Sequence, residues 1–240
     1  PPIPDGLVSL AGDRILAVGS RALEGPVEDL GSAALLPGLI NAHTHLEFSF
    51  LPRPIGRPGM AFSQWVRLVV SQFRSPPTPN GKAEALDGAS SLGVVRESDW
   101  TTADRTGADG KTDGKSAEAI ERGLGELIRS GTTAVADIAQ PSFPVHLWNQ
   151  SSMKAAVFVE LRAPTARRVP LALQAAQQAI SAWQSATETS SPSGPEGGAG
   201  WQLGLSPHAP YTVRPELLES AVGLAQQYRL PLAMHLAESL

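Results

Sequence analysis

Five histidines are the side chains of this 240-residue sequence that are best suited to bind a metal ion, and two of them stand close together. His43 and His45 lie two residues apart in the segment NAHTHLE, which follows an apolar run. On an extended chain, residues at this spacing point to the same face. Two neutral imidazoles on one face would form half of a metal site. The alternative is a pair of edge histidines bonded to solvent, since a bare H-x-H pattern is short.

A third histidine follows another apolar run near the end of the sequence. His235 lies in PLAMHLAES, and Glu238 comes three residues later. Active sites of parallel α/β folds gather at the carboxyl ends of the strands, so His235 would give a third imidazole to the same ion. The Glu238 carboxylate would move a proton beside the metal-bound water. The alternative for His235 alone is a hydrogen-bonded histidine of the core.

The two other histidines have different expected roles. His208 ends the run WQLGLSPH, where it would ligate the metal or hold a substrate. His146 lies in PSFPVHLWN, between an expected strand and a short helix, and we expect a structural or surface role for it. Because three of the five histidines end apolar runs, one metal centre explains their placement better than three separate roles.

Composition excludes several other kinds of site. With 19 basic and 23 acidic residues, the chain has no basic surplus for the phosphates of a nucleic acid. It has no cysteine, which excludes disulfides, thiolate catalysis and the cysteine-ligated zinc of one deaminase type. No apolar run reaches the roughly 18 residues of a membrane span, and no basic n-region opens the sequence. We therefore expect a cytoplasmic protein that binds neither nucleic acid nor membrane.

The elements that must position these histidines alternate along the chain. Apolar runs typical of strands buried on both faces cover residues 35–42, 132–139, 154–163, 201–208 and 231–238. Helical periodicity lies between them, at residues 62–73, 120–128, 173–183 and 218–225. This β-α succession predicts an α/β fold with parallel strands. No glycine-rich phosphate motif is present, which disfavours a nucleotide-binding α/β protein whose histidines are incidental.

Four motifs in this order give the chain a family resemblance: PGLINAHTHLEFSF, GLGELIRSGTTAVAD, LSPHAPYT and MHLAES. The sequence resembles the amidohydrolase superfamily, in its cytosine deaminase-like and S-adenosylhomocysteine (aminodeoxyfutalosine) deaminase-like branch. The resemblance implies a (β/α)8 barrel of the TIM type beside a small β-sandwich. Residues 1–36 would form the N-terminal part of the sandwich and residues 37–240 the barrel, with polar loop insertions at 75–116 and 185–200. The length leaves room for about five β/α units, so we expect an incomplete barrel whose outer strands are 35–42 and 231–237.

The same resemblance assigns roles to the motif residues. His43 and His45 match the metal ligands of the first barrel strand, and His235 matches the ligand of the fifth. Glu238 matches the acid that passes a proton to the substrate ring, and His208 matches a substrate-orienting histidine. The family's further ligands, a histidine on the sixth strand and an aspartate on the eighth, have no counterpart in this sequence. Since WQLGLSPH contains no lysine to bridge two metals, one divalent ion is expected, zinc or alternatively iron.

The resemblance implies a hydrolase acting on carbon–nitrogen bonds: a deaminase of a purine-like base or nucleoside that uses a metal-activated water. The partner would be a small heterocyclic substrate. A homo-oligomer is one of the states that the sequence leaves open. One alternative is an amidohydrolase that acts on a cyclic amide or a chlorinated heteroaromatic ring. Another is an inactive or fragmentary amidohydrolase-like protein.

The proton-transfer role of Glu238 yields a testable prediction. Glu238→Gln keeps the size of the side chain but removes the titrating oxygen, so in an intact parent enzyme the catalytic rate should fall about 10²–10⁴-fold while the metal stays bound. Steady-state kinetics and metal analysis of the same preparation measure both quantities. Loss of the metal from the variant would identify Glu238 as a ligand instead.

Overall fold

The computed structural model describes residues 2–12, 14–21, 24–51, 55–74, 114–189 and 200–237. The chain divides into two compact units, Pro1–Pro37 and Gly38–Leu240. Most of the two polar insertions expected from the sequence lies outside the described residues.

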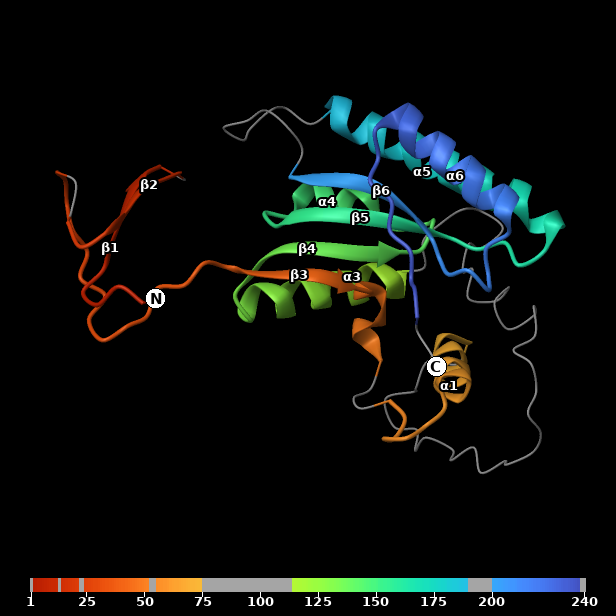
Figure 1. Cartoon of the computed structure of the whole chain (residues 1–240), viewed down its shortest axis with the longest axis horizontal. Helices are drawn as coiled ribbons and strands as arrows, with labels where there is room; N and C mark the ends of the chain where they lie inside the picture. The colour runs from red at the N-terminus through yellow and green to blue at the C-terminus, as the bar shows by residue number, and fades with distance from the viewer. Residues whose placement is uncertain are drawn as a thin grey trace. The chain divides into compact units, whose positions relative to one another are not determined.

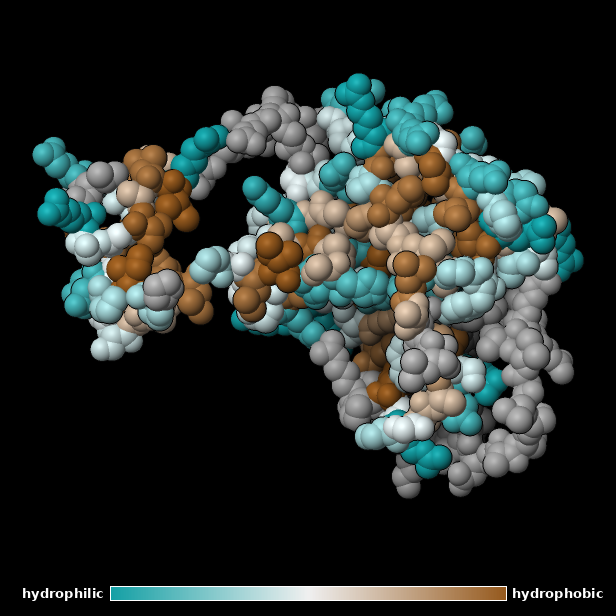
Figure 2. All heavy atoms as spheres, viewed as in Figure 1, coloured by the Kyte–Doolittle hydropathy of each residue, from teal (hydrophilic) through white to brown (hydrophobic). Residues whose placement is uncertain are grey.

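The first unit contains an antiparallel pair of strands, β1 (Leu7–Ala11) and β2 (Arg14–Gly19). Gly12, with φ of 59°, lies in the turn that joins them, a conformation that glycine adopts at little cost. Figure 2 shows hydrophobic side chains at the surface of this unit. Leu10, Ile15 and Val18 of the two strands are each more than half exposed. The assignment of residues 1–36 to a β-sandwich stays a prediction.

The second unit is built on a four-stranded parallel sheet in the order β3-β4-β5-β6 (Figure 1). Its strands are β3 (Leu39–Thr44), β4 (Thr132–Ala139), β5 (Lys154–Leu161) and β6 (Trp201–Pro207). The expected α/β fold with parallel strands is confirmed. Because neighbours in the sheet are also neighbours in the sequence, each crossover adds one strand at the same side of the sheet.

Helices connect and cover these strands. In chain order they are η1 (Leu46–Phe50), α1 (Phe62–Arg74), α3 (Gly114–Arg129), α4 (Val145–Gln150), η2 (Ala166–Arg168), α5 (Val169–Thr189) and α6 (Pro215–Tyr228). Helix α3 packs against η1 and β4, whereas α5 and α6 pack against β5, β6 and each other (Figure 1). Val157 and Val159 of β5 and Leu203 and Leu205 of β6 have no exposed surface, so the core lies around these two strands. Within the described residues, no helix is long and apolar enough to cross a membrane.

Two expected strands differ in the structure. The first begins at Leu39 rather than at residue 35, because Pro37 has no N–H to give to a strand ladder. The expected strand over residues 231–238 is wrong, since only Leu232 makes an isolated bridge, to Leu205 of β6. Pro231 again lacks an N–H, and Ala237 turns the chain aside with a positive φ of 54°. Residues 231–235 still run parallel to β6 as an extended segment.

Both expected insertions are shorter than their predicted bounds of 75–116 and 185–200. Helix α3 begins at Gly114, and α5 continues to Thr189. At the polar end of α5, the Thr187 hydroxyl lies 2.9 Å from the carbonyl oxygen of Gln184 and 3.1 Å from that of Trp183, both within the helix. A threonine in the last turn can thus bond inside the helix instead of opening it.

The close approach of residues 231–235 to β6 depends on Gly204. A Cβ at this position would lie 3.0 Å from the carbonyl oxygen of Pro231 and closer still to the Phe158 ring. Gly204→Ala should therefore lower the free energy of unfolding by about 1–3 kcal/mol, measured by urea denaturation. Gly223→Ala in α6 is the matched control, because a Cβ there meets nothing within 4 Å. Equal stability of the two variants would contradict this role of Gly204.

Candidate metal centre

The polar side chains of the second unit gather where its parallel strands end. His43 is the second-last residue of β3, and His45 directly follows that strand. Glu160 is near the end of β5, and His208 follows β6 immediately. His235 follows the extended segment beside β6. The carboxyl ends of parallel strands meet at one edge of a sheet, so one fold places all five residues together.

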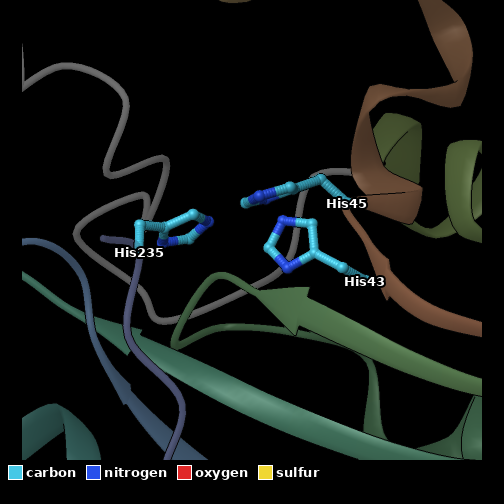
Figure 3. Close-up of side chains that lie close together, drawn as sticks. All are labelled: His43, His45 and His235. Carbon is cyan, nitrogen blue, oxygen red and sulfur yellow. The ribbon is translucent and has the colours of Figure 1, made fainter. Parts of the chain in front are cut away.

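His43, His45 and His235 form a cluster of three imidazoles (Figure 3). One ligand nitrogen from each ring lies within 4.8 Å of the other two. The ring centroids of His43 and His235 are 4.9 Å apart, and those of His45 and His235 are 5.5 Å apart. Ligand nitrogens of a tetrahedral zinc ion are separated by about 3.4 Å, so small side-chain rotations would close this set on one ion.

The environment of His45 fits a metal ligand. Burial, the largest effect, lowers the pKa of His45 to about 4, so the ring is neutral at pH 7. Its Nδ1 atom is buried and has no hydrogen-bond partner among the residues that the structure describes. The ring stacks on Phe48 with a centroid distance of 4.9 Å. A neutral imidazole with an unsatisfied buried nitrogen, beside two further imidazoles, is the donor set that a divalent ion requires.

Main-chain hydrogen bonds fix the position of His235. The His235 amide donates to the carbonyl oxygen of His208 at 2.8 Å, and the His208 amide donates to that of Leu161 at 3.0 Å. His235 Nδ1 lies 3.2 Å from the same His208 oxygen, which can only accept, so this nitrogen carries the proton. The Nε2 atom of the neutral ring is then left with a lone pair for a ligand bond.

The structure places the other predicted residues as follows. His208 is 8 % exposed and its ring centroid lies 5.1 Å from that of His235, so it borders the three-histidine cluster. His146 is exposed on α4 and belongs to neither group of residues that could hold a metal ion. Glu238 lies outside the described residues.

Sequence reasoning missed a buried polar network beside the histidines. Gln140, just after β4, donates to Glu47 at 3.1 Å and accepts from Arg162 at 2.9 Å. Arg162 also pairs with Glu160 at 3.2 Å. The available signal was an acid and a base two residues apart, Glu160 and Arg162, at the end of an apolar run. In a strand this spacing places both side chains on the same face.

The pKa values of the two glutamates in this network, Glu47 and Glu160, are shifted in opposite directions. Burial raises the pKa of Glu47 to about 8, despite its hydrogen bond from Gln140. Burial would also raise the pKa of Glu160, but Arg162 and the nearby imidazoles of His208, His45 and His235 hold it below its usual value. Glu160 is therefore the ionised carboxylate of the site.

A third buried acid, Asp137 of β4, anchors the chain that follows His45. Its carboxylate is 1 % exposed and accepts the main-chain N–H of Leu46 at 2.8 Å. Burial raises the pKa of Asp137 to about 7, although this hydrogen bond opposes the shift. Asp137 thus connects the H-x-H segment to the neighbouring strand.

These features agree with comparisons to known proteins. The model of the amidohydrolase family matches residues 34–240, and the chain belongs to that family. A relative in Nitratidesulfovibrio vulgaris, named 5-methylthioadenosine/S-adenosylhomocysteine deaminase, is 26 % identical over 254 residues. That alignment covers 99 % of this chain and 45 % of the relative. A Bacillus cereus protein of the same name is 25 % identical over 248 residues, which cover 99 % of this chain and 46 % of that protein. The chain thus spans less than half the length of these relatives.

A solved structure supports the fold. Guanine deaminase from C. acetobutylicum, with bound guanine in its active site, matches with a TM-score of 0.62 at 17 % identity. The match covers 96 % of this chain and 48 % of that protein. At this level of identity the likeness concerns the arrangement of strands and helices.

The raised pKa of Asp137 predicts how stability depends on pH. The folded protein holds the Asp137 proton up to a pKa of about 7, whereas the unfolded chain releases it near 3.8. The stabilising contribution is therefore fully present below pH 3.8 and is lost as pH rises through 7. Asp137→Asn keeps an acceptor for Leu46 but does not titrate. The stability of the wild type relative to this variant should fall by roughly 4 kcal/mol from about pH 4 to pH 8.

Urea denaturation of both proteins after chelation of metal measures this difference across the pH range. A difference that does not change with pH would show that Asp137 titrates normally in the folded protein.

Proposed function

We propose that this chain carries the metal centre of a hydrolase that removes an amino group from the ring of a purine-like base or nucleoside. The observation that supports the proposal most directly is the convergence of His43, His45 and His235 at the carboxyl ends of the strands. Membership of the amidohydrolase family and relatives named as deaminases support the same reaction class.

His43, His45 and His235 would hold one divalent ion through neutral imidazole nitrogens. Zinc suits this ligand type, and ferrous iron suits it as well. Such an ion, when bound, lowers the pKa of water enough to provide a nucleophile at neutral pH. The low pKa of His45 keeps its ring available as a ligand without first losing a proton.

The remaining residues would handle the substrate. His208 Nδ1 lies 2.7 Å from the Thr212 hydroxyl, which fixes the ring at the border of the metal cluster. A fixed imidazole there can orient a heteroaromatic ring against the three histidines. Glu238 would pass a proton to the ring nitrogen and then toward the departing amine, a role that depends on its position in the MHLAES motif.

Metal analysis combined with an activity screen tests this function. The purified protein should contain about one zinc or iron ion per chain and should release ammonia from at least one aminopurine or its nucleoside. His235→Ala should lose most of the metal and the activity. His146→Ala is the matched control, since the exposed His146 on α4 should be replaceable without loss of either.

Two results would contradict the proposal. Full metal content in His235→Ala would show that the ion binds elsewhere. A metal-loaded protein that releases chloride from a chlorinated triazine, or opens a cyclic amide, but frees no ammonia from aminopurines would replace deamination by one of the alternative ring hydrolyses.

A further inference from the structure

The Glu160 carboxylate uses its two oxygens differently. Oε2 lies 3.2 Å from the Arg162 guanidinium and 3.5 Å from Gln140 Nε2. Oε1 is buried and has no hydrogen-bond partner among the described residues. The side chain as a whole is only 3 % exposed. One oxygen is therefore held by the protein, whereas the other is directed at the histidines without a donor.

Two nearby imidazoles do not give Oε1 a hydrogen bond. His208 Nε2 is 3.8 Å away and His235 Nδ1 is 4.0 Å away, both too far for a hydrogen bond. The proton on His235 Nδ1 is also directed at the His208 carbonyl oxygen. Oε1 is thus a buried acceptor beside the histidines that receives no hydrogen bond from the described residues.

His208 borders the same place without satisfying Oε1. Its Nδ1 atom lies 2.7 Å from the Thr212 hydroxyl, which holds the ring beside the three-histidine cluster, and its Nε2 atom lies 3.8 Å from Glu160 Oε1. A buried carboxylate oxygen without a hydrogen bond has a free-energy cost, which a donor on a bound molecule removes.

We propose that Glu160 is a specificity-determining residue whose Oε1 atom, beside His208 Nε2, accepts a hydrogen bond from an N–H group of the substrate ring. This inference rests on the proposed function and narrows its substrate class. The substrate ring then carries a second donor, an amine or a ring N–H, in addition to the amino group that leaves. In the bound substrate this donor lies close to His235. A ring with a carboxylate or phosphate at that place is rejected, because it would bring a second anion against a buried carboxylate.

Binding of purine pairs that differ in one donor tests the proposal. Adenine and 9-methyladenine differ by the N9–H, and 2,6-diaminopurine and adenine differ by the 2-amino group. Each is measured with the metal-loaded protein as a Kd by calorimetry, or as a KM where the ligand is turned over. The proteins are the wild type, Glu160→Gln, and Glu219→Gln as a matched control with the same chemical change at an exposed site on α6.

We expect the wild type to favour the donor-bearing member of at least one pair by about 10- to 100-fold. Glu160→Gln should lose this preference, because the amide can present a donor in place of the acceptor, and Glu219→Gln should keep it. Thermal melting of each variant verifies that it is folded. If Glu160→Gln does not fold, Glu160→Asp replaces it, since the shorter carboxylate should weaken the same preference.

Three results would overturn the proposal. The first is an unchanged preference in Glu160→Gln, and the second is the absence of any preference in the wild type. The third is a second metal ion per chain that disappears in Glu160→Gln, which would make Glu160, His208 and His235 a cation site instead. Failure of the proposed function is a different result: no purine releases ammonia, although the binding ratios can still be measured.

Discussion

The site depends on main-chain hydrogen bonds that continue past the ends of the regular strands. The amide of His208 bonds to Leu161, and the amide of His235 bonds to His208, so the strand ends stay in register beyond the sheet. Without this ladder, residues 231–235 would have only their bonds to Leu205 of β6 to hold them. The same carbonyl of His208 also sets the tautomer of His235. One peptide group thereby fixes both the position and the tautomer of a candidate metal ligand.

Buried charge is the second constraint on this region. Glu47, Asp137 and Glu160 are each at most 5 % exposed, and Glu160 forms a direct ion pair with the Arg162 guanidinium at 3.2 Å. Arg162 is shared between Glu160 and Gln140, and Gln140 in turn bonds to Glu47. Acids without a cation stay protonated to higher pH, whereas the paired acid stays ionised, because desolvation is offset only where an opposite charge is near. The site therefore places its one persistent negative charge next to the imidazoles.

The histidines were predictable from the sequence because their residue type and their position after apolar runs both point to one edge of a parallel sheet. The order of strands over residues 132–207 was predictable for the same reason. The roles of Asp137 and Glu160 were not predictable, since the contacts of an acid inside an apolar run are made with neighbouring strands that are distant in the sequence. The weak pairing of residues 231–235 was also hidden: their composition is that of a strand, but Pro231 and the turn at Ala237 limit the hydrogen bonds they can make.

The hydrogen bond from Leu46 to Asp137 bears on protein design. The H-x-H pair is often regarded as a short, self-contained metal-binding segment, yet here the chain leaves His45 in a direction fixed by a carboxylate of the adjacent strand. A designer who transplanted NAHTHLE alone into another parallel sheet would copy the ligands without the group that orients them. The smallest transferable unit is thus two strands, with the histidines on one and an aspartate at the level of Thr44 on the other.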